Sequence, residues 1–387
     1  MLNKEIPNIY KEATKRAIEL NLPFALFALP GSDEYRFYAS RPDEDDYNAV
    51  NDSITTCDSF FITRFAQPIG GGSMIKAELS AEEVVALPSD TEPWPGPELT
   101  ARPTSTSYAN YYAQIRTFRH AIGRRKVTKA VLSRRIVAES TLDPFDLASR
   151  YFDLCPGTFR ALYFTQETGL WLTATPELLL SAHKDSDDDS PVAFETMSLA
   201  GTRVPSPDAS WDEKNRLEHL TVLDFIRDIF TNEGLQPEVH EAELVPFGGI
   251  EHLCHRITAS GHCNVFNLID RMSPTPALGG YPADAAIKLI SDTELHNRYC
   301  YGGVVGVISE NDLRAYVNLR CALLSPDLSA KGGMKLNIFA GGGIMKDSNP
   351  KREWVEAASK AMPLFSIISP DDPEVIKHIP AGWADLK

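Results

Sequence analysis

Short apolar runs bounded by glycine, proline, asparagine and aspartate recur along most of the chain after residue 125. Several are rich in β-branched, leucine and aromatic residues, a composition typical of strands. We therefore predict strands at residues 129–137, 159–165, 169–175, 178–182, 304–308, 313–324 and 334–340. Tight glycine turns between several of them favour antiparallel pairing. The expected fold is a mixed, largely antiparallel α/β (α+β) domain.

Three segments have the periodicity of helices, at residues 108–123, 211–232 and 350–362. In the second, one apolar stripe contains Leu217, Leu220, Leu223 and Ile226, and a neighbouring stripe contains Glu218, Val222, Phe225 and Ile229. Two adjacent stripes predict a broadly buried helix. Glu218, at the head of its stripe, then needs a partner or a strongly shifted pKa. The third helix has a clear start, because Asn349 is a good N-cap and Pro350 suits the first helical position.

The chain divides into two parts that differ in the clarity of their patterns. Residues 1–104 alternate short apolar runs with turn signals and end in a proline-rich stretch at 87–103, the best linker candidate. Residues 105–387 carry the strands and helices predicted above. No repeat of 20–50 residues is found in the sequence. We expect the two parts to form one structural domain.

Composition and charge narrow the choice of partners. The chain of 387 residues has a net charge of −15, from 38 basic and 53 acidic side chains. This balance argues against nucleic-acid and anionic-membrane partners, which require basic surfaces. The six cysteines form no CxxC pair, so neither a disulfide framework nor a zinc ribbon is indicated. No apolar run reaches transmembrane length and the first residues lack a signal-peptide pattern, so we expect a cytoplasmic protein.

Two segments suggest metal ions at first sight. The acidic segment at 183–191 lacks the loop-closing glycine and glutamate of an EF-hand, and a solvated loop is the favoured interpretation. The histidines and cysteines at 252–263 follow the spacing HxCHx6HC, which matches no structural zinc pattern.

Glu353, Glu356 and Lys360 lie on one face of the predicted C-terminal helix. Taken alone, they fit a solvated face with an ion pair. The glycine-rich run at 340–344, which ends the preceding strand, favours another interpretation, because backbone without Cβ atoms can approach a ligand closely and offer N–H groups to an anion. Two glutamates and a lysine beside such a run would form a metal-and-anion site.

Three further residues are candidates for chemistry. Arg320 is central in the predicted strand 313–324, on its polar face, where it either grips a carboxylate or lies on an exposed sheet face. Lys129 opens a strand and is either a surface lysine or, at a buried mouth, a base with a lowered pKa. Glu177 stands between a proline turn and an apolar run, where burial would raise its pKa toward that of a general acid.

Nine short segments, in this order, carry a family resemblance: KAVLSR at 129–134, TPELL at 175–179, LAGTR at 199–203, EKNRLEH at 213–219, PTPA at 274–277, YGGVVG at 301–306, LRCA at 319–322, AGGGI at 340–344 and EWVE at 353–356. Together they resemble the chorismate-utilising enzymes, which include anthranilate, aminodeoxychorismate, salicylate and isochorismate synthases. The resemblance covers roughly residues 105–365.

The resemblance implies two large, mostly antiparallel β-sheets packed face to face with helices outside. Residues 1–104 would be a weakly matched N-terminal part of that fold, and 105–387 the chorismate-binding catalytic region. It also implies Mg²⁺, held mainly by Glu218 and Glu356 with Glu353 nearby. The cation would bind the ring carboxylate of chorismate and stabilise charge as the C4 oxygen departs.

The same resemblance implies a role for each remaining candidate. Lys129 would activate the attacking water, and Glu177 would protonate the leaving hydroxyl. The substrate-binding residues would be Arg320 and the Gly341 backbone for the enolpyruvyl carboxylate, Gly201, Thr202 and Lys360 for the ring carboxylate, and His252, Ala277 and Tyr301 along the pocket wall.

Three positions favour one activity within the family. Ala200 stands where aminodeoxychorismate synthases commonly carry a nucleophilic lysine, and Lys129 is the water-activating lysine that anthranilate synthases lack. Ala277 is typical of isochorismate synthases, whereas salicylate and anthranilate synthases tend to have threonine. We therefore predict an isomerase that converts chorismate to isochorismate by water addition at C2 with loss of the C4 hydroxyl.

The alternatives within the family are salicylate synthase and anthranilate synthase component I, although a glutaminase partner is not expected. An inactive binding protein is disfavoured by the presence of Lys129, Glu177, Glu218 and Glu356. Isochorismate serves both menaquinone and siderophore biosynthesis, and generality favours menaquinone. Asn215 departs from the family, which usually has aspartate or glutamate there. The site thus loses one negative charge, while the amide can still bond a metal-bound water.

Overall fold

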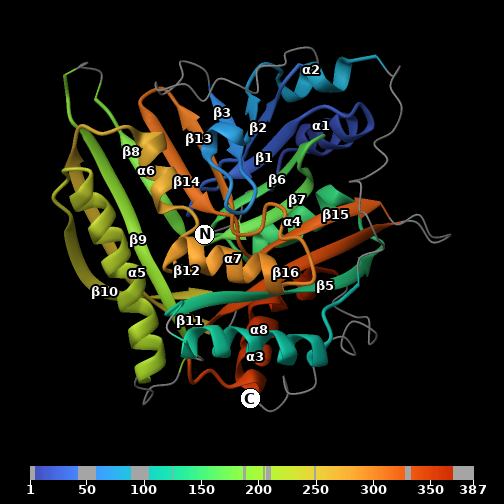
Figure 1. Ribbon diagram of the computed structural model, residues 1–387. Coiled ribbons are helices and arrows are strands. Elements are labelled where there is room, and N and C mark those ends of the chain that lie inside the picture. The colour runs from blue at the N-terminus through green and yellow to red at the C-terminus, as the bar shows by residue number, and fades with distance from the viewer. Residues whose placement is uncertain are drawn as a thin grey trace.

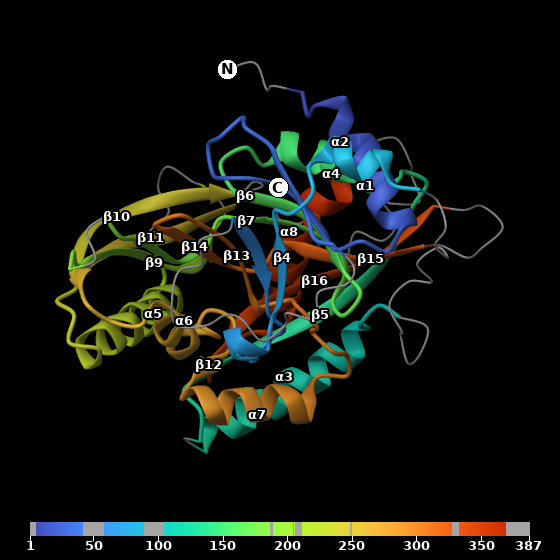
Figure 2. The same ribbon diagram turned by 90° about the horizontal axis from the view of Figure 1, so that it is seen from above.

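A computed structural model of the chain describes residues 5–41, 58–88, 104–124, 126–185, 189–203, 205, 211–247, 250–326 and 333–368. Two large sheets form its centre and the helices lie outside them (Figures 1 and 2). Within these ranges, no helix is both long enough and apolar enough to cross a membrane.

Every strand pairing within the two sheets is antiparallel. Sheet A has the order β12 (Gly280–Tyr281), β5 (Lys129–Ser140), β16 (Met334–Ile344), β15 (Cys321–Pro326), β7 (Gly169–Thr175), β6 (Phe159–Thr165), β1 (Phe24–Ala28) and β2 (Arg36–Ala39). Sheet B has the order β10 (Glu238–Phe247), β11 (Ile250–Gly261), β9 (Val192–Arg203), β8 (Leu178–His183), β14 (Asp312–Val317), β13 (Val304–Ser309), β3 (Ser59–Ile62) and β4 (Ser73–Lys76).

The helices pack in three groups. The outer face of sheet A is covered by α1 (Asn8–Glu19), α2 (Ala81–Ala86), α4 (Pro144–Leu154) and α8 (Pro350–Ile368). A second group, α3 (Tyr108–Gly123) and α7 (Ala283–Thr293), packs against β5. The third comprises α5 (Glu213–Asn232) on β9 and α6 (Val265–Met272) on β8. A short 3₁₀ turn at Ile69–Gly71 precedes β4.

Aromatic side chains hold the two sheets together. Phe159 of sheet A stacks on Tyr316 of sheet B with their ring centroids 4.3 Å apart. Phe60 of sheet B lies 5.3 Å from Tyr163 of sheet A by the same measure. Such pairs contribute about 0.5–1.5 kcal/mol each beyond the apolar area they bury. The N-terminal strands take part in both sheets, since β1 and β2 end sheet A whereas β3 and β4 end sheet B.

Several predictions from the sequence are confirmed. The antiparallel α+β class, the helix at 108–123 and the strands at 159–165 and 169–175 agree with the structure. The Asn349 side chain accepts hydrogen bonds from the backbone N–H groups of Lys351 and Arg352, as expected of an N-cap. The proline-rich stretch at 87–103 lies almost wholly outside the described residues, and the acidic segment at 183–191 lies partly outside them.

The single strand predicted at 313–324 is wrong. Residues 312–317 form β14 in sheet B, and residues 321–326 form β15 in sheet A, so the chain crosses between the sheets at positions 318–320. Arg320 has a positive φ of 53° in this crossing and is buried. The alternation of apolar and polar residues continues through the crossing by coincidence. The inferred polar sheet face around Arg320 therefore does not exist.

The prediction of a broadly buried α5 is also wrong in part. Leu217 and Leu220 are each 46% exposed, whereas the stripe headed by Glu218 faces β9 and is largely buried. Sequence patterns also missed the long strands β9, β10 and β11. In β10, six of the ten residues are exposed glutamate, alanine, leucine or proline residues. Burial therefore does not alternate cleanly along this strand. A strand at the edge of a sheet leaves little period-2 signal when both of its faces are solvated.

A buried ion pair connects the end of α7 to β5. Arg298 donates to both oxygens of Glu294 at 2.6 and 2.8 Å, and also to the carbonyl oxygens of Val131 and Leu278 at 2.7 and 2.9 Å. Glu294 in turn accepts hydrogen bonds from the backbone and hydroxyl of Ser133. These contacts set the position of β5 relative to the segment around residue 278.

We expect Arg298→Met to lower the free energy of unfolding by about 3–5 kcal/mol, because it leaves the Glu294 carboxylate buried without its partner. Urea denaturation measures this difference. The matched control is Lys288→Met, which removes an exposed pair with Asp292 on the same helix (3.0 Å) and should cost less than about 1 kcal/mol. Equal losses in the two variants would show that the buried pair has no special structural weight.

Candidate functional site

A cavity of about 620 Å³, counting its open mouth, has walls from both sheets and from α5 and α8. Glu177 and Glu218 line it. So do all eight residues that the sequence predicts to bind substrate, namely Gly201, Thr202, His252, Ala277, Tyr301, Arg320, Gly341 and Lys360. Lys129 and Glu356 adjoin this cavity through ion pairs with the lining residues Glu218 and Lys360. Glu353 lies next to Glu356 beside Gly342 and pairs with Lys214. The structure thus brings the predicted site residues together from segments far apart in the sequence.

Glycines 341–343 form the floor of the site. They pair with β5 on one side, but the pairing of β16 with β15 ends at Ile338, so their other edge is free of strand contacts. A Cβ atom at Gly343 would lie 2.3 Å from Glu218 Oε1 and 2.6 Å from Lys129 Cε. A Cβ atom at Gly342 would lie 3.2 Å from Glu353 Oε2. The charged groups occupy the space that side chains at these glycines would fill.

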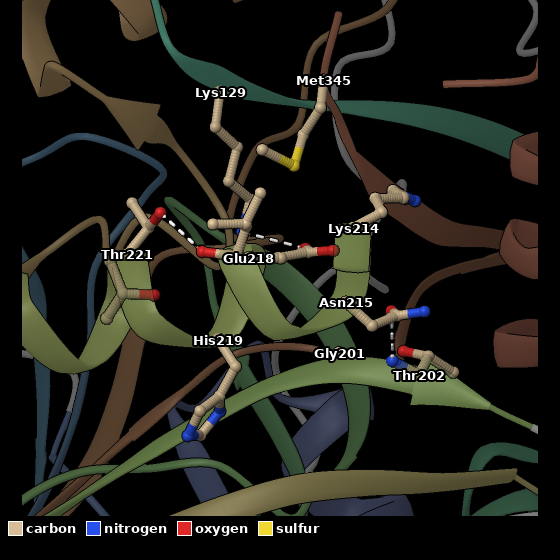
Figure 3. A network of polar contacts seen from close by, with 12 residues as sticks. Lys129, Gly201, Thr202, Lys214, Asn215, Glu218, His219, Thr221 and Met345 are labelled. Carbon is tan, nitrogen blue, oxygen red and sulfur yellow. Dashed lines mark hydrogen bonds and ion pairs between the residues drawn. The ribbon is translucent and has the colours of Figure 1, made fainter. Parts of the chain in front are cut away.

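Lys129 and Glu218 form a buried ion pair on this floor. Lys129 reaches from β5 toward the first turns of α5, where Glu218 meets its ammonium group at 2.9 Å (Figure 3). The lysine side chain is fully buried. Burial alone would raise the pKa of Glu218, but Lys129 and Lys214 outweigh it, and the pKa is lowered. The expectation that Glu218 needs a partner is met by Lys129.

The two glutamates of α8 each face a lysine. Lys360 Nζ lies 2.8 Å from Glu356 Oε1 and donates to the Gly341 carbonyl oxygen at 3.0 Å. Lys214 Nζ lies 2.7 Å from Glu353 Oε1. Burial and the neighbouring Glu356 raise the pKa of Glu353, whereas Lys360 and Lys214 overcome burial and lower that of Glu356. Three carboxylates and three lysines thus share this end of the cavity.

The donor chemistry of this cluster fits Mg²⁺, since carboxylate oxygens are the hard donors that this cation prefers. Glu353 Oε2 is also buried and lacks a hydrogen-bond partner within the described ranges. The carboxylates do not, however, form a finished coordination shell. In the part of the chain that the structure describes, no group of three or more acidic, histidine or cysteine side chains is placed to hold an ion. A cation would therefore take the place of ammonium groups at these carboxylates.

Arg320 and His252 form the opposite wall. Arg320 Nη2 lies 2.8 Å from His252 Nε2, and His252 Nδ1 lies 3.0 Å from the Gly201 carbonyl oxygen. An arginine can only donate, so Nε2 accepts and Nδ1 carries the hydrogen that is donated to Gly201. Burial and the adjacent Arg320 lower the pKa of His252 to about 3. The imidazole is therefore neutral. The Arg320 guanidinium, which also donates to the Lys360 carbonyl oxygen at 3.2 Å, lines the cavity.

Glu177 follows Pro176 and immediately precedes β8. Its side chain is buried, and the Thr275 hydroxyl donates to Oε1 at 3.4 Å. Burial raises the pKa of this carboxyl to about 7, although Lys129 opposes the shift. The rise expected from the proline turn and the following apolar run is present. Near neutral pH this group can therefore exchange a proton.

Sequence patterns missed Lys214, which belongs to the cluster through Glu353. Its signal was available, because Lys214 stands four residues before Glu218 and so on the same side of the helix. Phe339 and Leu319 also line the cavity without having been predicted. Asn215 stands where the family usually has an acid, and its amide was said to be able to bond a metal-bound water. In the structure its Oδ1 accepts a hydrogen bond from the Thr202 backbone N–H at 3.0 Å.

Comparison with known proteins agrees with this geometry. A family model described as chorismate binding enzyme matches residues 73–369. Isochorismate synthase EntC of Escherichia coli (strain K12) is 29% identical over 258 residues, which are 62% of each chain. Isochorismate synthase MenF of Haemophilus influenzae is 26% identical over 258 residues, 63% of this chain and 57% of that protein. Anthranilate synthase component 1 of Arthrobacter globiformis is 24% identical over 264 residues, 65% and 48% of the two chains. The match thus spans about three fifths or less of these relatives.

The fold is shared with solved structures. The menaquinone-specific isochorismate synthase MenF from Escherichia coli superposes with a TM-score of 0.72 at 20% identity, covering 95% of this chain and 92% of that one. At this identity the likeness shows the fold alone, two antiparallel sheets with helices outside. The family model covers far more than half of the sequence. The chain therefore belongs to the chorismate binding enzyme family.

Proposed function

We propose that this protein is an isochorismate synthase, an isomerase that adds water at C2 of chorismate and releases the C4 hydroxyl. The observation that carries the proposal is that two buried ionisable groups, Lys129 and Glu177, lie at the same cavity. Lys129 Nζ lies 2.9 Å from Glu218 Oε1, whereas burial raises the pKa of Glu177 to about 7. A hydration with loss of hydroxide needs a base and an acid at separate positions.

Each group has a role in the proposed reaction. Lys129, acting as the neutral amine, accepts a proton from the water as that water forms the new C2–O bond. Glu177 donates its proton to the C4 oxygen as the C4–O bond breaks, so one water enters and one leaves. The two conjugated double bonds of the ring shift in concert between C2 and C4, and no oxidant or second substrate other than water is needed. Lys129 also interacts electrostatically with Glu177 and opposes the rise in its pKa.

The two carboxylates of chorismate match the positive groups of the cavity. Arg320 faces the cavity next to the free edge of Gly341, whose N–H points to the same side as the carbonyl that Lys360 contacts. We place the enolpyruvyl carboxylate there, in a bidentate contact with the guanidinium. The ring carboxylate fits near Gly201, Thr202 and Lys360. A dianion would thereby place its two negative charges beside Arg320 and Lys360.

Mg²⁺ completes the proposal. Glu218 and Glu356 would hold it, with Glu353 beside them. When bound, it would supply positive charge to the ring carboxylate and to the departing oxygen. Binding requires these carboxylates to give up their present lysine contacts.

Salicylate synthase and anthranilate synthase component I remain the second candidates, because an anthranilate synthase is among the relatives. Ala277 lines the cavity at the position where those enzymes tend to have threonine. We propose a cytoplasmic enzyme without a glutaminase partner. Isochorismate from this reaction could feed either menaquinone or siderophore biosynthesis, and relatives named for each, MenF and EntC, are similar to the chain.

Purified protein incubated with chorismate and Mg²⁺ should form isochorismate, identified by chromatography, and the reaction should run in reverse from isochorismate. EDTA should abolish turnover, and added Mg²⁺ should restore it. Ammonium salts should yield no anthranilate. Salicylate with pyruvate, or anthranilate, as the main product would replace the proposal by one of the alternatives. Full turnover in metal-free buffer would remove the proposed role of the carboxylate cluster.

The Glu177→Gln variant should lower kcat by about 10²–10⁴-fold while the KM for chorismate changes far less, because only the proton donor is lost. In the parent, kcat/KM should fall as pH rises through about 7, where Glu177 loses its proton. The exposed Glu310→Gln variant is the control and should behave as the parent.

An independent measurement follows from the same group. The folded state holds the Glu177 proton more tightly than the unfolded state, in which the ordinary value is 4.5. The stabilisation it provides is full below that pH and is lost as pH rises to about 7. The stability of the parent relative to Glu177→Gln should therefore decline across this window. A kcat near that of the parent together with a flat stability difference would show that Glu177 is neither the acid nor perturbed.

A further inference from the structure

A β-bulge lies at the edge of the cavity, where β9 pairs with β11. His252 stands opposite Thr202 and Leu253 opposite Ala200, so Gly201 is an extra residue in the ladder. Its φ of +78° suits glycine, and a Cβ atom there would lie 3.2 Å from the backbone oxygen of Asn215. The bulge therefore packs directly on the first turn of α5.

The amide of Asn215 fastens the helix to this bulge. Its Oδ1 accepts a hydrogen bond from the Thr202 backbone N–H at 3.0 Å (Figure 3). Its Nδ2 donates to Asp212 Oδ1 at 2.9 Å. Asp212 is the N-cap of α5, and the same oxygen accepts from the Asn215 backbone N–H at 2.8 Å. The donor and the acceptor of the amide are thus both engaged by protein groups.

The other side of the bulge leads to the substrate wall. Both the Gly201 carbonyl oxygen and the Thr202 hydroxyl lie within hydrogen-bond distance of His252 Nδ1, at 3.0 and 3.2 Å. His252 Nε2 then accepts from Arg320. A continuous set of contacts therefore runs from the start of the helix that carries Lys214 and Glu218 to the arginine on the opposite wall.

We infer that Asn215 is a positioning residue for the substrate-carboxylate side of the cavity, and that it does not serve the metal cluster. The inference rests on the proposed function and adds a residue to it. The amide sets the bulge at Gly201 and Thr202, which holds His252 and through it the Arg320 guanidinium. An aspartate in this position would still accept from the Thr202 N–H. It could not donate to Asp212, and it would place two carboxylates in contact.

The charge pattern explains why an amide fits this chain although the family usually has an acid. The N-cap is itself a carboxylate, Asp212, so a second one three residues later would be repelled. With Asn215 the pair carries a single negative charge at the N-terminus of α5, where the helix dipole favours it. Position 215 therefore adds no negative charge to the metal cluster, as expected if its uncharged side chain links α5 to the bulge.

The test compares Asn215→Asp with the exchanged pair Asp212→Asn plus Asn215→Asp, which restores one amide and one carboxylate in the opposite order. Asn232→Asp, an exposed change in the same helix, is the matched control. Calorimetry gives the Kd of chorismate and, without substrate, the Kd of Mg²⁺. Steady-state assays give KM and kcat separately.

Asn215→Asp should weaken chorismate binding and raise KM by about 10-fold, the effect of one lost hydrogen bond to a charged group, with kcat and the Mg²⁺ Kd within about threefold of the parent. The exchanged pair should recover most of the chorismate affinity, and the control should change nothing. Tighter Mg²⁺ binding with unchanged chorismate affinity would place residue 215 in the metal cluster and overturn the inference, as would a failure of the exchanged pair to recover affinity. If the parent forms no isochorismate, the proposed function fails, while the chorismate Kd values still decide the role of Asn215.

Discussion

Lys129 and Glu218 meet at 2.9 Å in a volume that a single methyl group on Gly343 would occupy. Both are buried, and removing either from such a pair leaves an uncompensated charge that typically costs about 3–5 kcal/mol. The pair can exist only because β16 presents backbone without side chains at positions 341–343. The same stretch has one edge free of β15, so Lys360 and the cavity reach its carbonyl and N–H groups. The floor therefore leaves the space in which Lys129, Glu218, Glu353 and Glu356 lie.

Burial raises the pKa of every acidic group around this floor, but neighbouring lysines reverse the shift at some of them. Glu218 and Glu356 have lysines close enough to outweigh desolvation, and their pKa values are lowered. Glu177 accepts a hydrogen bond from the Thr275 hydroxyl, and desolvation there outweighs the charge of Lys129, so its pKa rises to about 7. One cavity thereby holds carboxylates that remain charged, suited to a cation, and one that exchanges a proton near neutral pH. This separation of roles is what an acid-and-base hydration requires.

The sequence predicted the site better than it predicted the paths of the strands. The sequence allowed one group of site residues to be recognised. Glu353, Glu356 and Lys360 share one face of a helix, and glycines 341–343 come shortly before that helix in the chain. Arg320 was identified as a functional residue for the wrong reason, since a period-2 pattern cannot reveal that the chain leaves one sheet for the other between Val317 and Cys321. The partners of each charge were also beyond reach, because Lys129 and Glu218 are 89 positions apart and meet only through packing. Asn215 was discussed only in relation to the metal ion. Its contacts in the structure are with the β-bulge at Gly201, which no local sequence pattern reveals.

The most direct test of the central claim is the turnover of chorismate by Gly343→Ala, measured against Gly123→Ala, where a Cβ atom meets nothing within 4 Å. The added methyl must displace Glu218 or Lys129, and displacements of about 1 Å in an active site can cost about 10²-fold in rate. The account predicts that Gly343→Ala forms isochorismate at least about 10²-fold more slowly while remaining folded by circular dichroism, and that Gly123→Ala matches the parent. A Gly343→Ala enzyme with the parental rate would contradict it, since the glycine floor would then not determine the placement of the charged groups.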